Sequence, residues 1–121
     1  MNVRYALFIL VSMFAAACGS SSSSSTTAPT TNTGTPVSIV SGSSTLTTTA
    51  YSPNPVTVAV GGTVTWKNND SVTHNSVATN GAWNSGNIAP GGSFSMTFPS
   101  AGSFPYHCSI HPGMVGTVTV Q

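Results

Sequence analysis

Residues 102–120 read GSFPYHCSIHPGMVGTVTV, and they are the most informative stretch of the chain for its fold. Phe104, Tyr106 and Cys108 alternate with other residues, as expected for a β-strand with one buried face. The Pro-Gly pair after them marks a loop, and the alternating residues 115–120 form a second strand. The stretch therefore predicts two neighbouring strands joined by a short loop.

Short alternating runs of this kind recur through the rest of the chain, with glycine, proline and asparagine turns between them. Strands are expected at 37–41, 46–51, 56–60, 63–67, 74–78, 94–98, 104–108 and 115–120. No long stretch has helical periodicity, so these seven or eight strands predict an all-β sandwich or barrel. Trp66 and Met96 occupy alternating core positions, whereas Trp83 lies in a loop-rich stretch and is expected to be partly exposed.

Charged side chains are almost absent from the sequence. Only Arg4, Lys67 and Asp70 are charged, which is 2 % of the 121 residues, against about a quarter in an ordinary soluble domain. This composition excludes a basic surface for nucleic acid, a pair of catalytic carboxylates and a calcium site built from several acids. Lys67 and Asp70 flank a turn sequence and are expected to be solvated there.

The N-terminal residues 1–17 are predicted to be a signal peptide. Arg4 precedes the apolar run 6–17, which is shorter than the roughly 20 residues that a membrane-spanning helix needs. Cys18 follows three alanines, and this pattern resembles the lipid-bearing cysteine of bacterial lipoproteins. Ordinary cleavage before Cys18, giving a soluble secreted protein with a spare thiol, is the alternative.

Residues 18–36 are rich in serine and threonine and contain no bulky apolar side chain. Such a stretch buries too little surface to offset the entropy of ordering, so a flexible linker after the lipidated cysteine is expected. Residues 37–121 are then the folded domain. The expected location is the periplasm or the cell surface, with the domain tethered to a membrane through the lipid anchor at Cys18.

Residues that bind transition metals gather around the strand and loop quoted first. Cys108 ends the strand, and His111 and Met114 lie in the loop after it, so a hairpin brings the three to one centre. His74, which follows another predicted strand and its turn, supplies a fourth ligand. Two imidazoles, a thiolate and a thioether form the donor set of a blue-copper electron-transfer site. Strand alternation turns His107 away from Cys108, which favours a surface position or one beside the site.

Three stretches of the chain resemble the cupredoxin family, which includes plastocyanin, azurin and amicyanin. They are VAVGGTVTWKNNDSVTHN (58–75), SGNIAPGGSFSMTF (85–98) and GSFPYHCSIHPGMVGTVTV (102–120), and they cover nearly all of the predicted domain. The resemblance implies a Greek-key β-sandwich of seven to eight strands with one copper ion at one end.

The resemblance also implies a role for each residue of the site. His74, Cys108 and His111 match the strong equatorial copper ligands, and Met114 matches the weak axial one. Asn75 matches a residue whose hydrogen bonds join the two ligand-bearing loops. Only two residues separate His111 from Met114, a spacing shared with amicyanin but shorter than in plastocyanin and azurin.

The function implied is that of a one-electron carrier that cycles between Cu(II) and Cu(I) outside the cytoplasm. Redox partner proteins would dock transiently on uncharged surface near His111, and the chain is expected to be a monomer that binds no nucleic acid. Copper storage or delivery is the alternative. A zinc site is disfavoured because an axial methionine is a poor zinc ligand, and an enzyme is disfavoured because the ligand set leaves no open position.

Overall fold

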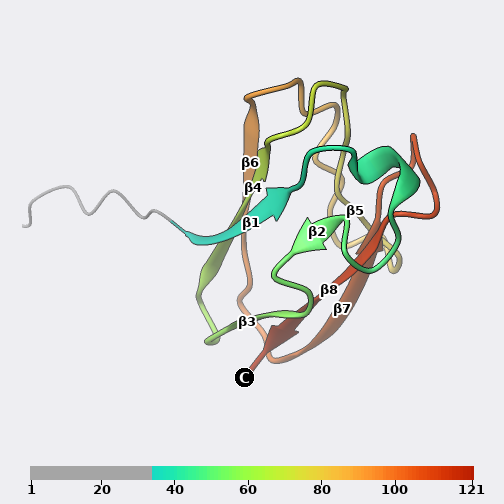
Figure 1. Ribbon diagram of the computed structural model, residues 1–121. Helices are drawn as coiled ribbons and strands as arrows, with labels where there is room; N and C mark the ends of the chain where they lie inside the picture. The colour runs from blue at the N-terminus through green and yellow to red at the C-terminus, as the bar shows by residue number, and fades with distance from the viewer. Residues whose placement is uncertain (1–33) are drawn as a thin grey trace, which may run out of the picture.

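Two four-stranded sheets pack face to face in the computed structural model, which describes residues 34–121 (Figure 1). The first sheet has the order β2 (Tyr51–Ser52), β1 (Thr35–Ile39), β4 (Thr63–Asn68) and β6 (Ser93–Thr97). The second has the order β3 (Val56–Val58), β8 (Val115–Val120), β7 (Gly102–His107) and β5 (Val77–Ala78). The predicted all-β sandwich of seven to eight strands is therefore confirmed, with eight strands present.

The predicted signal peptide 1–17, Cys18 and most of the predicted linker 18–36 lie outside the described residues. None of the helical segments found within residues 34–121 has the length and apolar character needed to cross a membrane.

The path of the chain ties the two sheets together. After β2, every connection crosses from one sheet to the other until β7 is reached. β1 with β4 and β3 with β8 pair in parallel, and the other neighbours pair antiparallel. β4 and β7 belong to different sheets, and hydrogen bonds between the connections that follow them join these connections at one end of the sandwich.

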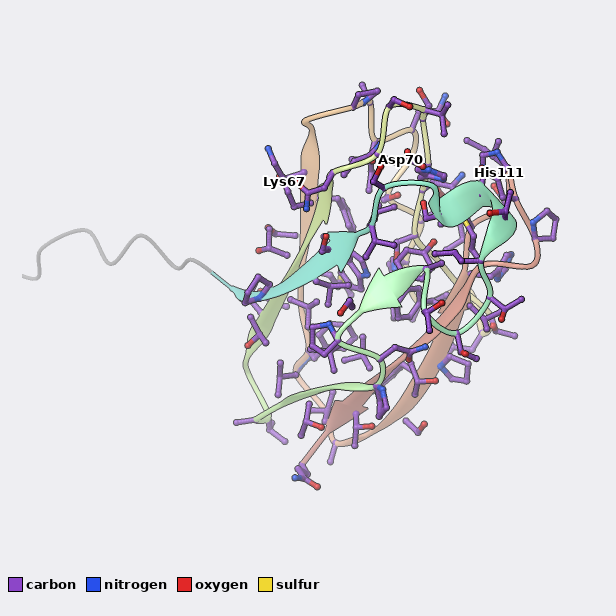
Figure 2. All side chains as sticks on the ribbon, in the orientation of Figure 1. Lys67, Asp70 and His111 are labelled. Carbon is purple, nitrogen blue, oxygen red and sulfur yellow. The ribbon has the colours of Figure 1, made fainter. Side chains whose placement is uncertain are left out.

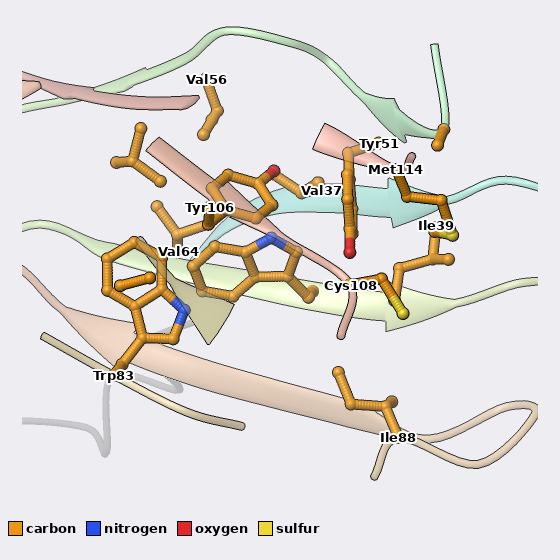
Figure 3. Packing of buried hydrophobic residues seen from close by; sticks show 14 of the residues in the cluster. Val37, Ile39, Tyr51, Val56, Val64, Trp83, Ile88, Tyr106, Cys108 and Met114 are labelled. Carbon is orange, nitrogen blue, oxygen red and sulfur yellow. The ribbon is translucent and has the colours of Figure 1, made fainter. Parts of the chain in front are cut away.

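Aromatic rings fill the space between the sheets (Figure 3). Trp66 on β4 is fully buried, as predicted, and its ring meets Tyr106 of β7 edge to face with the centroids 5.4 Å apart. Trp83 is also buried, so the expectation that it would be partly exposed was wrong. Its loop is pinned to β5 by backbone hydrogen bonds, and its indole N–H donates to the Ser76 hydroxyl at 3.0 Å. Met96 is half-buried against this core.

Several predicted strands differ in extent from the structure. The expected strand 74–78 is reduced to β5, and the expected strand 56–60 ends earlier, as β3. β1 begins at Thr35, inside the expected linker, because Thr35 and Pro36 pair with β4 in the parallel ladder. The expected strand 46–51 is reduced to β2, and a 3-10 helix, η1 (Ser43–Thr45), precedes it. Successive turns closed by backbone hydrogen bonds occupy this segment instead of a ladder.

Gly116 on β8 gives a direct test of the packing between β7 and β8. A Cβ at this position would lie 2.4 Å from Cζ of Tyr106, closer than van der Waals contact allows. We expect Gly116→Ala to lower the free energy of unfolding of the metal-free protein by about 1–3 kcal/mol, because the buried ring has no room to move. Gly113→Ala is the matched control, since nothing lies within 4 Å of a Cβ there. Urea titration followed by tryptophan fluorescence measures both, and equal midpoints would contradict this account.

Candidate metal centre

Three side chains bring their ligand atoms together where the two sheets meet at one end. The ligand atoms of His74, Cys108 and His111 all lie within 4.8 Å of one another. The Cys108 sulfur is 3.9 Å from Nδ1 of each histidine, and the two Nδ1 atoms are 3.2 Å apart. Two nitrogens bound to one ion at about 2.0–2.1 Å, near the tetrahedral angle, lie roughly 3.3 Å apart. The spacing therefore fits a single metal ion.

Backbone pairing holds each of these residues in place. His74 exchanges two hydrogen bonds with Ile88, of 3.2 and 2.8 Å, in an isolated bridge outside the sheets. Cys108 comes directly after β7, and its N–H donates to the Met114 carbonyl at 3.1 Å. The Met114 N–H donates in turn to the His111 carbonyl at 2.9 Å, which closes the loop before β8. The ligand loop is thus a tight hairpin, as residues 102–120 predicted.

The four residues predicted as ligands differ in exposure. His74, Cys108 and Met114 are completely buried, and Cys108 is a free cysteine. Figure 3 shows the sulfur atoms of Met114 and Cys108 at the same end of the hydrophobic core. His111 is half-buried and lies at the edge of the molecule (Figure 2). The site is therefore closed on its inner side, and His111 is the member of the set that reaches the surface.

Asn75 connects the two loops that carry these residues. Its amide nitrogen donates to the Ser109 hydroxyl at 2.7 Å, and its amide oxygen accepts the Ser109 backbone N–H at 2.8 Å. The Tyr51 hydroxyl, which nothing in the sequence pointed to, donates to the Asn75 carbonyl at 2.7 Å. Burial, followed by the charge of the Cys108 thiolate, raises the pKa of Tyr51 far above its ordinary value, so its proton stays in place.

Asp70 is the main correction to the sequence analysis, which placed it in solvent. It is buried, and its Oδ2 lies 2.8 Å from Nε2 of His74. Oδ1 accepts the backbone N–H groups of Gly42 at 3.0 Å and Ser71 at 2.8 Å. The Gly42 N–H, together with His74, holds the pKa of Asp70 well below its ordinary value. The one signal in the sequence was the spacing, an acid four residues before a predicted ligand histidine.

The two other polar residues that the sequence analysis discussed lie outside the cluster. His107 is half-buried on β7, where it pairs with Val77 and Val115, and it does not belong to the group of ligand atoms. Lys67 is exposed, as predicted; its ammonium group donates to the Gly91 carbonyl, and it lies well away from His111 in Figure 2.

Comparison with known proteins gives consistent results. Residues 38–121 match the family described as copper binding proteins, plastocyanin/azurin family. A plastocyanin of Scenedesmus fuscus is 39 % identical over 84 residues, covering 59 % of this chain and 86 % of that protein. Amicyanin of Paracoccus denitrificans is 36 % identical over 76 residues, covering 59 % of this chain and 58 % of that protein.

Solved structures extend the comparison to the fold. A structure described as a novel purple cupredoxin from Nitrosopumilus maritimus superposes with a TM-score of 0.67 and 38 % identity. The match covers 72 % of this chain and 99 % of that one. A structure of an amicyanin mutant, with one methionine replaced by alanine and in the Cu(I) form, superposes with a TM-score of 0.62 and 29 % identity. That match covers 73 % of this chain and 82 % of the amicyanin chain.

The hydrogen bonds of Asn75 allow a test that needs no metal. We expect Asn75→Ala to lower the free energy of unfolding of the metal-free protein by about 1–3 kcal/mol, because the Ser109 N–H loses its acceptor in a partly buried place. Asn69→Ala is the control, since Asn69 is exposed and makes one side-chain hydrogen bond to Ser38; its effect should stay within about 0.5 kcal/mol. Guanidinium titration measures both, and an Asn75 variant as stable as the Asn69 variant would contradict the role assigned to this residue.

Proposed function

The chain belongs to the plastocyanin/azurin family of copper-binding proteins, and from this we propose that it is a type 1 copper protein that carries single electrons. We assign His74, Cys108 and His111 as the strong ligands of one copper ion and Met114 as the weak axial ligand. The observation that carries the proposal is the gathering of two imidazole nitrogens and one thiol sulfur within 4.8 Å. Bound copper supplies the redox chemistry by passing between Cu(II) and Cu(I).

The chemistry of the donor set favours copper over other metals. Thiolate and thioether sulfur suit Cu(I), imidazole suits Cu(II), and the set as a whole is that of blue-copper sites. The two sulfur donors, Cys108 and Met114, are completely buried and belong to the apolar core, which keeps water from them. An electron carrier, unlike an enzyme, needs no open coordination position, and this arrangement suits transfer better than storage and delivery.

The protein contributes rigidity. His74 comes from the connection after β4, and Cys108 and His111 come from the connection after β7, so the segments that carry the proposed ligands leave opposite sheets. The Asn75–Ser109 hydrogen bonds and the His74–Ile88 bridge hold them in one arrangement. Ligands fixed on a rigid scaffold change little between oxidation states, which lowers the reorganisation that each transfer requires.

Electrons would enter and leave through the half-buried ring of His111. The residues around it are exposed and uncharged: Ile110 is 43 % exposed, Val115 is 37 % exposed, and Pro112 and Gly113 are exposed as well. We call Ile110, Pro112, Gly113 and Val115 the His111 rim. Without charged groups, the rim suits brief apolar contact with a redox partner protein and offers nothing that nucleic acid would bind.

The proposed place of work is outside the cytoplasm, supported by the predicted signal peptide 1–17. We further propose that Cys18 is lipidated and that residues 18–36 tether a monomeric domain to the membrane. The support for this tether is the run of alanines before Cys18 and the serine-rich composition after it.

Addition of Cu(II) to the purified protein tests the site directly. We expect an intense visible absorption band from charge transfer between the Cys108 thiolate and copper, and its complete loss in Cys108→Ser. His107→Gln is the control, because this neighbouring histidine is outside the ligand cluster and its variant should keep the band. A protein that stays colourless with Cu(II), or a Cys108→Ser variant that keeps the band, would overturn the assignment.

The His111 rim can be tested without knowing the partner, through electron exchange between oxidised and reduced copies of the protein. The self-exchange rate, measured by NMR line broadening, should depend little on salt, because Lys67 and Asp70 are the only charged side chains among residues 34–121 and the rim is uncharged. We expect Ile110→Glu to slow exchange by roughly tenfold at low salt, as like charges then meet at the contact.

Val60→Glu is the control for the same added charge. Val60 is 53 % exposed in the turn between β3 and β4, at the opposite end of β4 from the ligand loops. Its variant should exchange electrons at nearly the rate of the unmodified protein. Equal slowing in both variants, or a steep salt dependence of the unmodified protein, would show that contact does not occur at the rim.

A further inference from the structure

The single acidic residue of the whole sequence lies buried against a proposed copper ligand. Asp70 is 8 % exposed and His74 is 0 % exposed, with 2.8 Å between Oδ2 and Nε2. Burial of a carboxylate is costly unless it is paired and hydrogen-bonded. Its side-chain partner in the structure is the ring of His74 and not Lys67, whose ammonium group bonds to a carbonyl elsewhere. The position of Asp70 therefore relates to the metal centre.

The carboxylate is held in position from several directions. Its Oδ1 accepts the N–H groups of Gly42 and Ser71, and its Oδ2 accepts the Ser43 hydroxyl at 3.2 Å. Gly42 and Ser43 belong to the segment between β1 and β2, which the structure bends into η1 beside the site. These donors favour the ionised carboxylate, so Oδ2 remains an acceptor for the His74 ring.

This arrangement decides which nitrogen of His74 carries the proton. An ionised carboxylate accepts hydrogen bonds only, so the ring nitrogen that faces Asp70 must be an N–H donor. A neutral imidazole with its proton on Nε2 leaves the lone pair of Nδ1 free. Nδ1 is the atom that lies 3.9 Å from the Cys108 sulfur and 3.2 Å from Nδ1 of His111. Asp70 thus points the unprotonated nitrogen at the centre of the proposed site.

We propose that Asp70 is a positioning residue for His74 and that its buried negative charge lowers the reduction potential of the copper site. The inference rests on the proposed function, because it concerns the same ion. With the Cys108 thiolate and the Asp70 carboxylate counted, the site is neutral around Cu(II) and carries one negative charge around Cu(I). The added electron therefore enters against a fixed negative charge in a poorly screened interior, which favours the oxidised form.

Asp70→Asn is the variant that removes the charge with the least change in shape. The amide oxygen of the new asparagine can still accept the Gly42 and Ser71 N–H groups. The amide NH₂ group then faces the Nε2–H group of His74, and because both are hydrogen-bond donors, no hydrogen bond forms between them. We expect a higher reduction potential than in the unmodified protein. We also expect Cu(II) affinity to fall roughly 10- to 100-fold, as for other residues that orient metal-binding histidines.

Two controls separate charge from packing. Ser43→Ala removes a hydroxyl that contacts both Oδ2 of Asp70 and Nε2 of His74 but leaves the carboxylate charge. Lys67→Met also changes the net charge by one unit, but at an exposed position. Both should shift the reduction potential much less than Asp70→Asn does. The inference would be overturned if Asp70→Asn binds copper and its reduction potential lies between those of Ser43→Ala and Lys67→Met.

A measurement on the unmodified protein covers the case in which Asp70→Asn does not fold. In the metal-free protein, ring ¹⁵N chemical shifts should show His74 as the Nε2–H tautomer, with a proton that exchanges slowly with water. A His74 ring protonated on Nδ1 would overturn the positioning role.

Failure of the proposed function and failure of the inference about Asp70 give different results. If the unmodified protein takes up no copper, the proposed function fails, and the proposed effect on the potential fails with it. If the unmodified protein gives the thiolate band while Asp70→Asn keeps the unmodified potential, the inference about Asp70 fails and the function stands.

Discussion

The pair of hydrogen bonds between Asn75 and Ser109 is the constraint on which the site depends. His74 is carried by a connection that leaves the first sheet, and Cys108 and His111 by one that leaves the second. Nothing in either sheet alone sets the distance between these side chains. The two bonds, of 2.7 and 2.8 Å, join the residue after His74 to the residue after Cys108. They turn two separate loops into one unit in which the three ligand atoms lie close together.

The interior is apolar along most of its length and polar at the end where the proposed ligands lie. Over most of its length the space between the sheets is filled by aromatic rings, with Trp66, Trp83 and Tyr106 in mutual contact. At the ligand end, the buried side chains include Asp70, His74 and Asn75, each hydrogen-bonded to a neighbouring side chain. Buried polar networks of this kind hold a single arrangement when every member is satisfied. The apolar part supplies the rigid support, and the polar end supplies the directional contacts.

Sequence patterns predicted those parts of the protein that local chemistry determines. Alternation over 102–120 indicated β7, the ligand loop and β8, and the residue types in that loop indicated copper. Burial of Asp70 and Trp83 was not predictable in this way, because each depends on partners remote from the local pattern. Asp70 is held by Gly42, 28 residues earlier in the chain, and an acid in a turn sequence is ordinarily solvated. Trp83 is buried because its loop folds back along β5, and the alternation of apolar residues in the sequence does not predict this contact.

The few charged side chains act differently according to whether they lie at the surface or in the interior. A charge on the surface is screened by salt over about 8–10 Å and acts mainly on encounter with other molecules. A charge in the interior is screened far less and acts on the groups beside it. In the part of the chain that the structure describes, Lys67 is the charged side chain left at the surface and Asp70 the one placed inside. The protein therefore keeps its one negative side chain beside His74, the proposed copper ligand, and the proposed docking surface, the His111 rim, is left without charge.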